Sequence, residues 1–405
     1  MAGSTPILHT ARWVVPVARP PIGYGALLVE QGIIKAVGTK EELAGSSKAR
    51  VVDHGQRVLF PGLVNAHTHL EFSALKGKCE KSESFCQWLK KVAWKRLLLS
   101  QKRVQSAAEA AVGELEKAGT ALAADVANLI DTGGYMAEQN VSGIIFHEVI
   151  GLKENKAEEV FRRRIAQLAS LKSSNQLVHS LSPHAPYSVS AELFHKVKVY
   201  CRERDLVTSV HLAESPEEIE FCLKGTGPLK RLLSLAGLWD KNWKVPGVSP
   251  VEYLADLGFL DERTLAVHLT QATARDVKIL AKGNVPVCLC VRSNAFTGVG
   301  QPPVKLLLEA GVNLCLGTDS LASNMDLDLV NEMRAIKRYH PFLSEATILE
   351  MATINGARAL GFAASLGSLE PGKRAYVLAV PVGESEDDPQ QAIFNARARV
   401  TWIVP

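Results

Sequence analysis

Residues 61–69 read Pro-Gly-Leu-Val-Asn-Ala-His-Thr-His, an apolar strand that runs into two histidines. Side chains two positions apart in a β-strand point to the same side of the sheet. The imidazoles of His67 and His69 can therefore reach one metal ion. A His-x-His pair alone is weak support for a metal site, so the interpretation depends on the segments that follow it in the chain.

The central part of the chain alternates apolar segments with long amphipathic ones, a pattern typical of parallel strands connected by helices. It predicts eight strands, at residues 60–65, 121–127, 143–149, 177–181, 207–211, 264–268, 285–289 and 312–317. Eight strands with interleaved helices favour an α/β fold closed into a (β/α)8 TIM barrel over an open sheet.

Both ends of the chain differ from this central part. Residues 1–59 and 363–405 contain short β-rich pieces broken by glycine and proline, which are typical of antiparallel sheets. We expect a small β-sandwich domain built from both chain ends, beside a barrel of residues 60–362. The 405 residues fit one barrel of about 250 residues and one companion domain.

The composition is that of a folded globular protein, because 47% of the residues are hydrophobic and 22% are charged. The 46 basic and 42 acidic residues are scattered, without the basic, aromatic-rich run of a nucleic-acid-binding surface. No apolar run approaches the ~18 residues of a membrane span, and residues 1–30 lack a signal-peptide pattern. The seven cysteines have no repeated metal-type spacing. We expect a cytoplasmic protein with a small-molecule substrate and with neither nucleic acid nor a membrane as partner; a homodimer is compatible with the sequence.

Three later strands also end in groups that bind metals or transfer protons. His211 closes one strand and is followed by Glu214, His268 closes the next strand, and Asp319 follows the last one. The carboxyl ends of barrel strands form the active site. These side chains are therefore expected to meet the two histidines of the first strand.

Three imidazoles and one carboxylate suit a single divalent ion, zinc or alternatively iron, with one position left for water. Such an ion lowers the pKa of its water toward neutrality. Attack by that water needs a group that takes and returns a proton, and Glu214 is the suitable carboxylate. We expect His268 to hydrogen-bond the water rather than to bind the metal.

The combined motifs resemble those of the amidohydrolase superfamily, and the resemblance covers nearly the whole chain. The matching segments are Pro-Gly-Leu-Val-Asn-Ala-His-Thr-His at 61–69, His-Leu-Ala-Glu at 211–214 and Leu-Gly-Thr-Asp-Ser at 316–320. The resemblance implies that Glu214 is the proton shuttle, that His268 orients the water and that Asp319 can also accept a proton. It implies one metal ion, because the expected fourth strand lacks the lysine of dinuclear relatives. The implied metal ligands are His67, His69, His211 and Asp319.

Residues 182–190, Ser-Pro-His-Ala-Pro-Tyr-Ser-Val-Ser, resemble the substrate-binding segment of the nucleoside and chlorotriazine deaminase branch, which places His184 against the substrate. Residues 65–73, 292–294 and 317–324 look most like aminodeoxyfutalosine deaminases of menaquinone synthesis. The resemblance implies hydrolytic deamination of an adenine-type nucleoside, in which metal-activated water attacks the amino-bearing ring carbon. The alternatives are a methylthioadenosine/adenosylhomocysteine deaminase, a chlorotriazine-type ring hydrolase, and a non-catalytic amidohydrolase-like scaffold. The complete set of expected metal ligands and proton carriers argues against the scaffold.

One departure from the family affects the substrate. Methylthioadenosine and adenosylhomocysteine deaminases place a ribose-binding glutamate shortly after a tryptophan, where this chain has Trp-Lys-Arg-Leu at 94–97. Arg96 or Arg292 is expected instead to pair with a substrate carboxylate, because a guanidinium offers a bidentate fork. Glu148, after the third strand, could touch the pocket. Six other histidines have no partner motif and are expected to be structural or exposed: His9, His54, His147, His179, His195 and His340.

Overall fold

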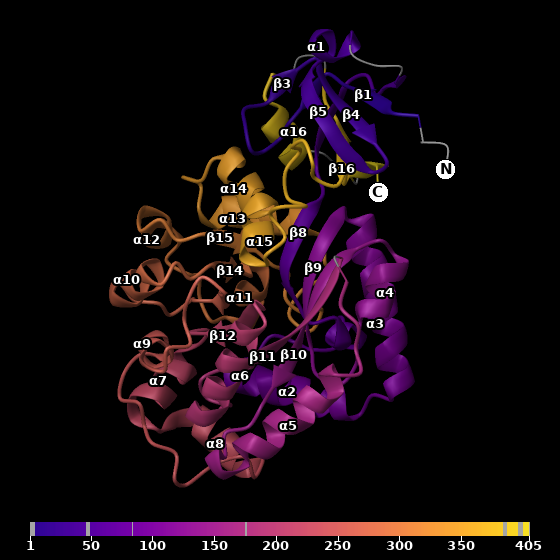
Figure 1. Cartoon of the computed structure of the whole chain (residues 1–405). Coiled ribbons are helices and arrows are strands. Elements are labelled where there is room, and N and C mark those ends of the chain that lie inside the picture. Colours follow the sequence, from indigo (N-terminus) through magenta and orange to yellow (C-terminus); the bar gives the residue numbers. More distant parts are fainter. Residues whose placement is uncertain are drawn as a thin grey trace.

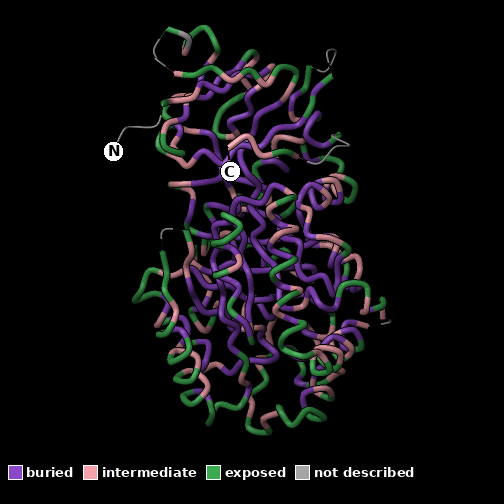
Figure 2. Tube along the Cα trace, turned by 90° about the vertical axis from the view of Figure 1, so that its right-hand side faces the viewer, coloured by how far each residue is buried: buried purple, intermediate pink, exposed green. Residues whose placement is uncertain are grey.

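The computed structural model describes residues 5–45, 49–82, 84–174, 176–383, 387–395 and 400–404, so the outermost residues of both end segments lie outside the described part. Figure 1 shows a central set of strands with helices around it, and a smaller β-rich unit that contains both chain ends. Buried residues run through the middle of both parts, and exposed residues lie at the periphery (Figure 2). No described helix has both the length and the apolar character needed to cross a membrane.

Eight parallel strands form the centre of the larger part, as the sequence pattern predicts. They are β8 Leu63–Thr68, β9 Thr120–Ala127, β10 Ser142–Val149, β11 Leu177–Pro183, β12 Thr208–Leu212, β13 Thr264–His268, β14 Val287–Leu289 and β15 Leu314–Leu316. They pair in the orders β11-β10-β9-β8 and β12-β13-β14-β15.

Backbone hydrogen bonds join the two four-stranded sheets at both seams. The His211 N–H donates to the His184 carbonyl at 3.0 Å, and the Asp319 N–H donates to the His67 carbonyl at 3.0 Å. The strands therefore close into the expected (β/α)8 barrel, and all eight carboxyl ends point to one rim. Apolar side chains such as Val64, Phe146 and Val267 fill its interior.

Helices cover the barrel and connect its strands. Those of the barrel are α2 Phe85–Leu97, α3 Gln101–Lys117, α4 Gly133–Glu138, α5 Ala157–Leu168, α6 Ala191–Glu203, α7 Pro216–Lys224, α8 Gly227–Leu235, α9 Pro250–Asp256, α10 Ala274–Lys282, α11 Val291–Thr297, α12 Val304–Glu309, α13 Leu329–Tyr339, α14 Glu345–Met351 and α15 Ile354–Ala359, with 3-10 turns η1 Leu70–Leu75 and η2 Glu154–Lys156. Several begin at a serine that caps the first turn; the Ser190 hydroxyl accepts from the Leu193 N–H, and the Ser215 hydroxyl accepts from the Glu218 N–H.

The smaller part contains two sheets, with strand orders β5-β4-β1-β6 and β17-β16-β7-β2-β3. Its elements are β1 Ile7–Thr10, β2 Trp13–Val14, β3 Ile22–Gly23, β4 Gly25–Glu30, β5 Ile33–Thr39, α1 Lys40–Ala44, β6 Arg50–Asp53, β7 Arg57–Pro61, β16 Val377–Pro381, α16 Pro389–Asn395 and β17 Thr401–Val404. Leu27, Leu59 and Val377 meet in one buried cluster between the sheets. Both chain ends therefore build this sandwich, although β1 pairs with β6, and β2 with β7, in parallel rather than antiparallel.

The strand predicted at residues 60–65 is wrong at its start. Residues up to Pro61 belong to β7, which pairs antiparallel with β16 in the sandwich, and the first barrel strand begins at Leu63. Gly62 lies between the two strands, and a Cβ added there would lie 2.5 Å from the Ala121 side chain. The chain passes between domains where only glycine fits.

Candidate metal centre

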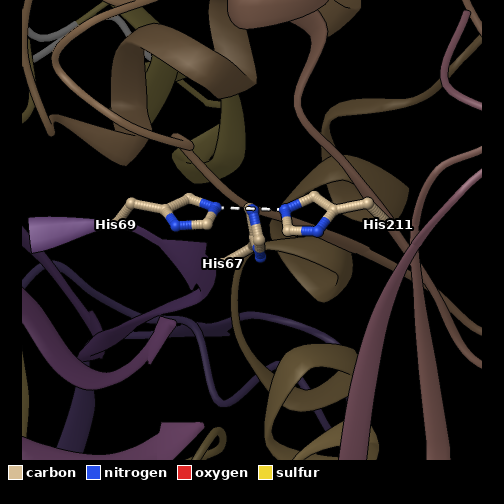
Figure 3. Close-up of side chains that lie close together, drawn as sticks. All are labelled: His67, His69 and His211. Atoms are coloured by element: carbon tan, nitrogen blue, oxygen red, sulfur yellow. Dashed lines mark hydrogen bonds between the residues drawn. The ribbon is translucent and has the colours of Figure 1, made fainter. Parts of the chain in front are cut away.

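Three histidines converge at the carboxyl rim of the barrel (Figure 3). His67 lies on β8, His69 follows it, and His211 lies on β12; all three side chains are buried. The Nε2 atoms of His69 and His211 lie 3.1 Å apart, and one ring nitrogen from each histidine lies within 4.8 Å of the others. The structure thus brings together the three imidazoles predicted to bind metal.

The three imidazole rings are in the neutral form that can bind a cation. Burial is the largest cause that holds the pKa of His67 and His211 well below the usual value for histidine, so both rings are neutral and offer lone pairs. The His67 Nε2 atom is buried and has no hydrogen-bond partner among the described residues. A buried nitrogen without a partner is costly, and a divalent ion among these rings would remove that cost. The Nδ1 of His211 bonds the His184 carbonyl at 2.9 Å, which leaves its Nε2 facing the other rings.

Asp319 supplies the expected carboxylate. Its Oδ1 lies 3.8 Å from Nε2 of both His67 and His69. The Ser293 hydroxyl donates to its Oδ2 at 2.5 Å and the Ser320 N–H to its Oδ1 at 2.7 Å. Burial opposes its ionisation, but the nearby histidines and these hydrogen bonds outweigh burial and lower its pKa. Its backbone is held at φ 58°, a strained conformation for a residue with a side chain.

Glu214 and His268 lie beside this cluster as expected. The Glu214 Oε1 is 3.5 Å from the His268 Nε2, and both side chains are buried. The Asn294 Oδ1, 2.9 Å from the His268 Nδ1, fixes the ring with Nε2 toward Glu214. Burial first, then the charge of Asp319, raises the pKa of Glu214 well above its usual value. The site thus contains a carboxyl group that can carry a proton, next to the four side chains predicted to bind metal.

The sequence analysis missed two residues that position this machinery. The buried Glu218 carboxylate accepts the N–H groups of Ala213 and Glu214, at 3.1 and 2.8 Å, and fixes the turn that carries Glu214. The Ser-x-x-Glu pattern at 215–218 is a helix-capping signal that could have identified it. Asn294, which holds His268, has no such local signal because it comes from a helix 26 residues away.

His184 and Glu148 lie next to the metal centre. The His184 ring is 5.0 Å from the His211 ring, and its Nε2 is 4.0 Å from the Glu148 Oε1. Burial, with His69 and His268, lowers the pKa of His184 to about 3. Burial, with the nearby Glu71, raises the pKa of Glu148 to about 8. The structure places both residues at the rim, and their contact with substrate stays a prediction.

The two arginines expected to meet a substrate carboxylate lie in different surroundings. Arg96 is half-buried, its Nε is buried without a hydrogen-bond partner among the described residues, and its charge acts on the buried Glu71. Arg292 instead makes a bidentate ion pair with Asp326, with N–O distances of 2.7 and 3.0 Å. The expectation for Arg292 is therefore not supported, because both of its terminal guanidinium nitrogens already bond the carboxylate of Asp326, 34 residues away.

Comparisons with known proteins agree with this architecture. The model of the Amidohydrolase family matches residues 58–402. The 5-methylthioadenosine/S-adenosylhomocysteine deaminase of Moorella thermoacetica is 31% identical over 382 residues, which cover 91% of this chain and 83% of the relative.

Two solved structures are similar over nearly their whole length. The Helicobacter pylori aminofutalosine deaminase in complex with methylthio-coformycin has a TM-score of 0.85 and 25% identity, covering 95% of this chain and 94% of that one. An adenosine deaminase from Xanthomonas campestris with bound zinc has a TM-score of 0.80 and 26% identity, covering 97% and 89%. The family suggested by the motifs is thus confirmed, and the chain belongs to the amidohydrolase family.

Proposed function

We propose that this protein is a metal-dependent hydrolytic deaminase of an adenine-type nucleoside. The observation that carries the proposal is the position of the buried Glu214 carboxyl, 3.5 Å from His268 and beside a cluster of three imidazoles and one carboxylate. Water-dependent removal of an amino group needs such a proton carrier next to an activated water. The deaminase relatives support the choice of reaction.

The donor set fits one borderline divalent ion, and zinc is the ion we propose. His67, His69, His211 and Asp319 would hold it, and the unpartnered His67 Nε2 is the atom that most clearly requires it. Bound there, the ion would lower the pKa of a water toward neutrality and so make that water a stronger nucleophile near pH 7.

The protein's own side chains carry out the remaining steps. His268, fixed by Asn294, orients the water through its Nε2. Asp319 and Glu214 accept protons as the water oxygen bonds to the amino-bearing ring carbon. One of these protons goes to the ring nitrogen beside that carbon, and Glu214 gives the other to the departing amine. The carbon–nitrogen bond breaks, and ammonia leaves while the oxygen stays on the ring as a carbonyl.

We assign substrate contacts to His184 and Glu148, because the His184 ring is 5.0 Å from the His211 ring and its Nε2 is 4.0 Å from the Glu148 Oε1. Arg96 is the group we propose for an anionic substituent on the nucleoside, since its Nε lacks a partner among the described residues. This assignment favours aminodeoxyfutalosine, whose benzoate is a carboxylate, over methylthioadenosine and adenosylhomocysteine.

Ammonia release from adenosine, methylthioadenosine, adenosylhomocysteine and aminodeoxyfutalosine tests the proposal, with protein of known metal content. We expect deamination of at least one nucleoside, and a selective rise in KM for aminodeoxyfutalosine in Arg96→Ala. Arg103→Ala, on the neighbouring helix α3, is the matched control. No ammonia from any of the four nucleosides, with one ion bound per chain, would contradict the proposal. Equal effects of Arg96→Ala on all substrates would contradict the role of Arg96 alone.

A further inference from the structure

A second histidine cluster lies on the outside of the barrel. His147 is on β10, His179 is on β11, and Asp131 is in the loop between β9 and α4. The Nε2 of His147 is 3.0 Å from the Nδ1 of His179, and the Asp131 Oδ1 is 3.8 Å from that same Nδ1. One donor atom from each of the three side chains lies within 4.8 Å of the others.

The strand register explains why these histidines do not belong to the barrel interior. Phe146 packs inside the barrel, whereas Ile145 packs among the residues under the surrounding helices. His147, two positions after Ile145, shares its outward face. His179 is the register partner of Ile145 on β11 and therefore faces outward too.

The spacing of the donor atoms suits a tetrahedral ion. Ligand atoms that each lie about 2.0–2.1 Å from zinc are separated by roughly 3.3 Å in that geometry. The two distances of 3.0 and 3.8 Å bracket this value, as do the 3.1 and 3.8 Å distances of the inner centre. Two imidazoles and one carboxylate are also a frequent donor set for such ions.

The charges around the cluster permit a cation. Burial, His179 and Arg164 lower the pKa of His147 to about 3, and burial lowers the pKa of His179, so both rings are neutral ligands near pH 7. The Arg164 guanidinium is engaged, because it donates to the Asn128 carbonyl and to the Gln167 side chain.

The cluster is open on one side. The Asp131 side chain is 33% exposed, while both histidines are buried. An ion can enter from that side, and water can complete its coordination. The Asp131 Oδ1 accepts the Gly133 N–H at 3.2 Å, which holds the carboxylate beside the two imidazoles.

We propose that Asp131, His147 and His179 bind a second divalent transition-metal ion of the zinc class, with water as the remaining ligand. This ion fastens the loop of residues 128–132 to β10 and β11. Asn128, at the start of that loop, donates to the Glu148 carboxyl at 3.3 Å, so the ion supports the active-site rim without touching the reacting atoms.

Calorimetric titration with Zn²⁺ tests the site, using protein whose inner centre already holds one zinc. We expect one further equivalent to bind per chain, and to bind more weakly as the pH falls because protons compete for the imidazoles. His179→Gln should abolish this second event. Asp131→Asn should weaken it by at least about tenfold. His195→Gln, an exposed histidine of α6, is the matched control and should bind as the wild type does.

Two results would overturn the proposal. One is a wild-type protein that takes up no second equivalent of Zn²⁺ at micromolar concentrations. The other is an Asp131→Asn protein that binds the second ion as tightly as the wild type. Asp131→Asn keeps the test decisive even if His179→Gln fails to fold. The Asp131 side chain is part-exposed, and the substitution replaces one carboxylate oxygen with an NH2 group. Retention of the inner zinc and a cooperative thermal unfolding transition verify that each variant is folded.

Discussion

The inner and the outer histidine clusters each combine imidazoles with one carboxylate, but they lie on different faces of the barrel strands. In both, imidazoles from separate parallel strands bring ring nitrogens to 3.0–3.1 Å, with a carboxylate oxygen 3.8 Å away. The inner cluster is next to the buried carboxyl of Glu214, whereas the outer cluster opens to solvent at Asp131. We therefore propose a catalytic role only for the inner cluster, because only there does a buried carboxyl that can carry a proton lie beside the predicted ligands.

The largest expected effect comes from loss of an inner ligand. His67→Ala should lower turnover by more than about 10⁴-fold, because both the ion and the proton transfers that depend on it are lost. The inner ion should be missing from the purified variant, as elemental analysis would measure. A variant that kept its inner ion and near-normal kcat would exclude His67 as a ligand.

Glu214→Gln removes the proton carrier and leaves the four ligands in place. We expect kcat to fall by about 10²–10⁴-fold, the usual contribution of a general acid–base group, while the metal content stays unchanged. Glu220→Gln, on the surface of the following helix α7, is the control. Turnover near the wild-type value in metal-replete Glu214→Gln would refute the shuttle role.

Asn294→Ala tests whether the orientation of His268 matters. Loss of the 2.9 Å bond to the His268 Nδ1 should reduce kcat by roughly 10- to 100-fold, the range seen when a supporting hydrogen bond at a metal site is removed. KM and melting temperature should change little, because Asn294 holds the ring and not the substrate. An effect confined to KM would instead place Asn294 in substrate binding.

The outer cluster is expected to affect stability rather than chemistry. In metal-free protein the pKa of His147 is about 3 when folded, against 6.5 as its ordinary value. As the pH falls below 6.5 the unfolded chain binds a proton that the folded chain cannot, so stability is lost. Between pH 7.5 and 5 the wild type should lose about 2 kcal/mol more than His147→Gln, since one pKa unit is worth about 1.4 kcal/mol. Urea unfolding with a chelator present measures this, and parallel pH curves for the two proteins would contradict it.

Much of the inner site could be predicted from the sequence because the carboxyl ends of all eight strands of a barrel meet at one rim. Each strand that ends in a histidine or aspartate delivers that side chain to the same rim. His67, His69, His211 and Asp319 converge for this reason, although the first and the last strand are far apart in the sequence. Asn65 at the first strand donates a hydrogen bond to Thr318 after the last one, 253 positions away. The same argument placed Glu214 and His268.

Three features could not be read in this way. The break at Gly62 depends on how closely Ala121 approaches, which only the packed domains determine. The occupation of Arg292 depends on Asp326, a residue in a separate loop. His147 and His179 were expected to be structural or exposed, since each is alone in its own segment and their pairing requires the register between β10 and β11.

The division of roles between the two clusters is tested most directly by measuring ammonia release and metal stoichiometry together for the wild type, His211→Gln and His179→Gln. We expect two ions per wild-type chain. His211→Gln should lose turnover and the inner ion, while His179→Gln should lose only the outer ion and keep kcat within about twofold, as expected for a group that makes no contact with the reacting atoms. Equal loss of turnover in both variants, with the inner ion still bound in His179→Gln, would contradict the division of roles between the two faces of the barrel.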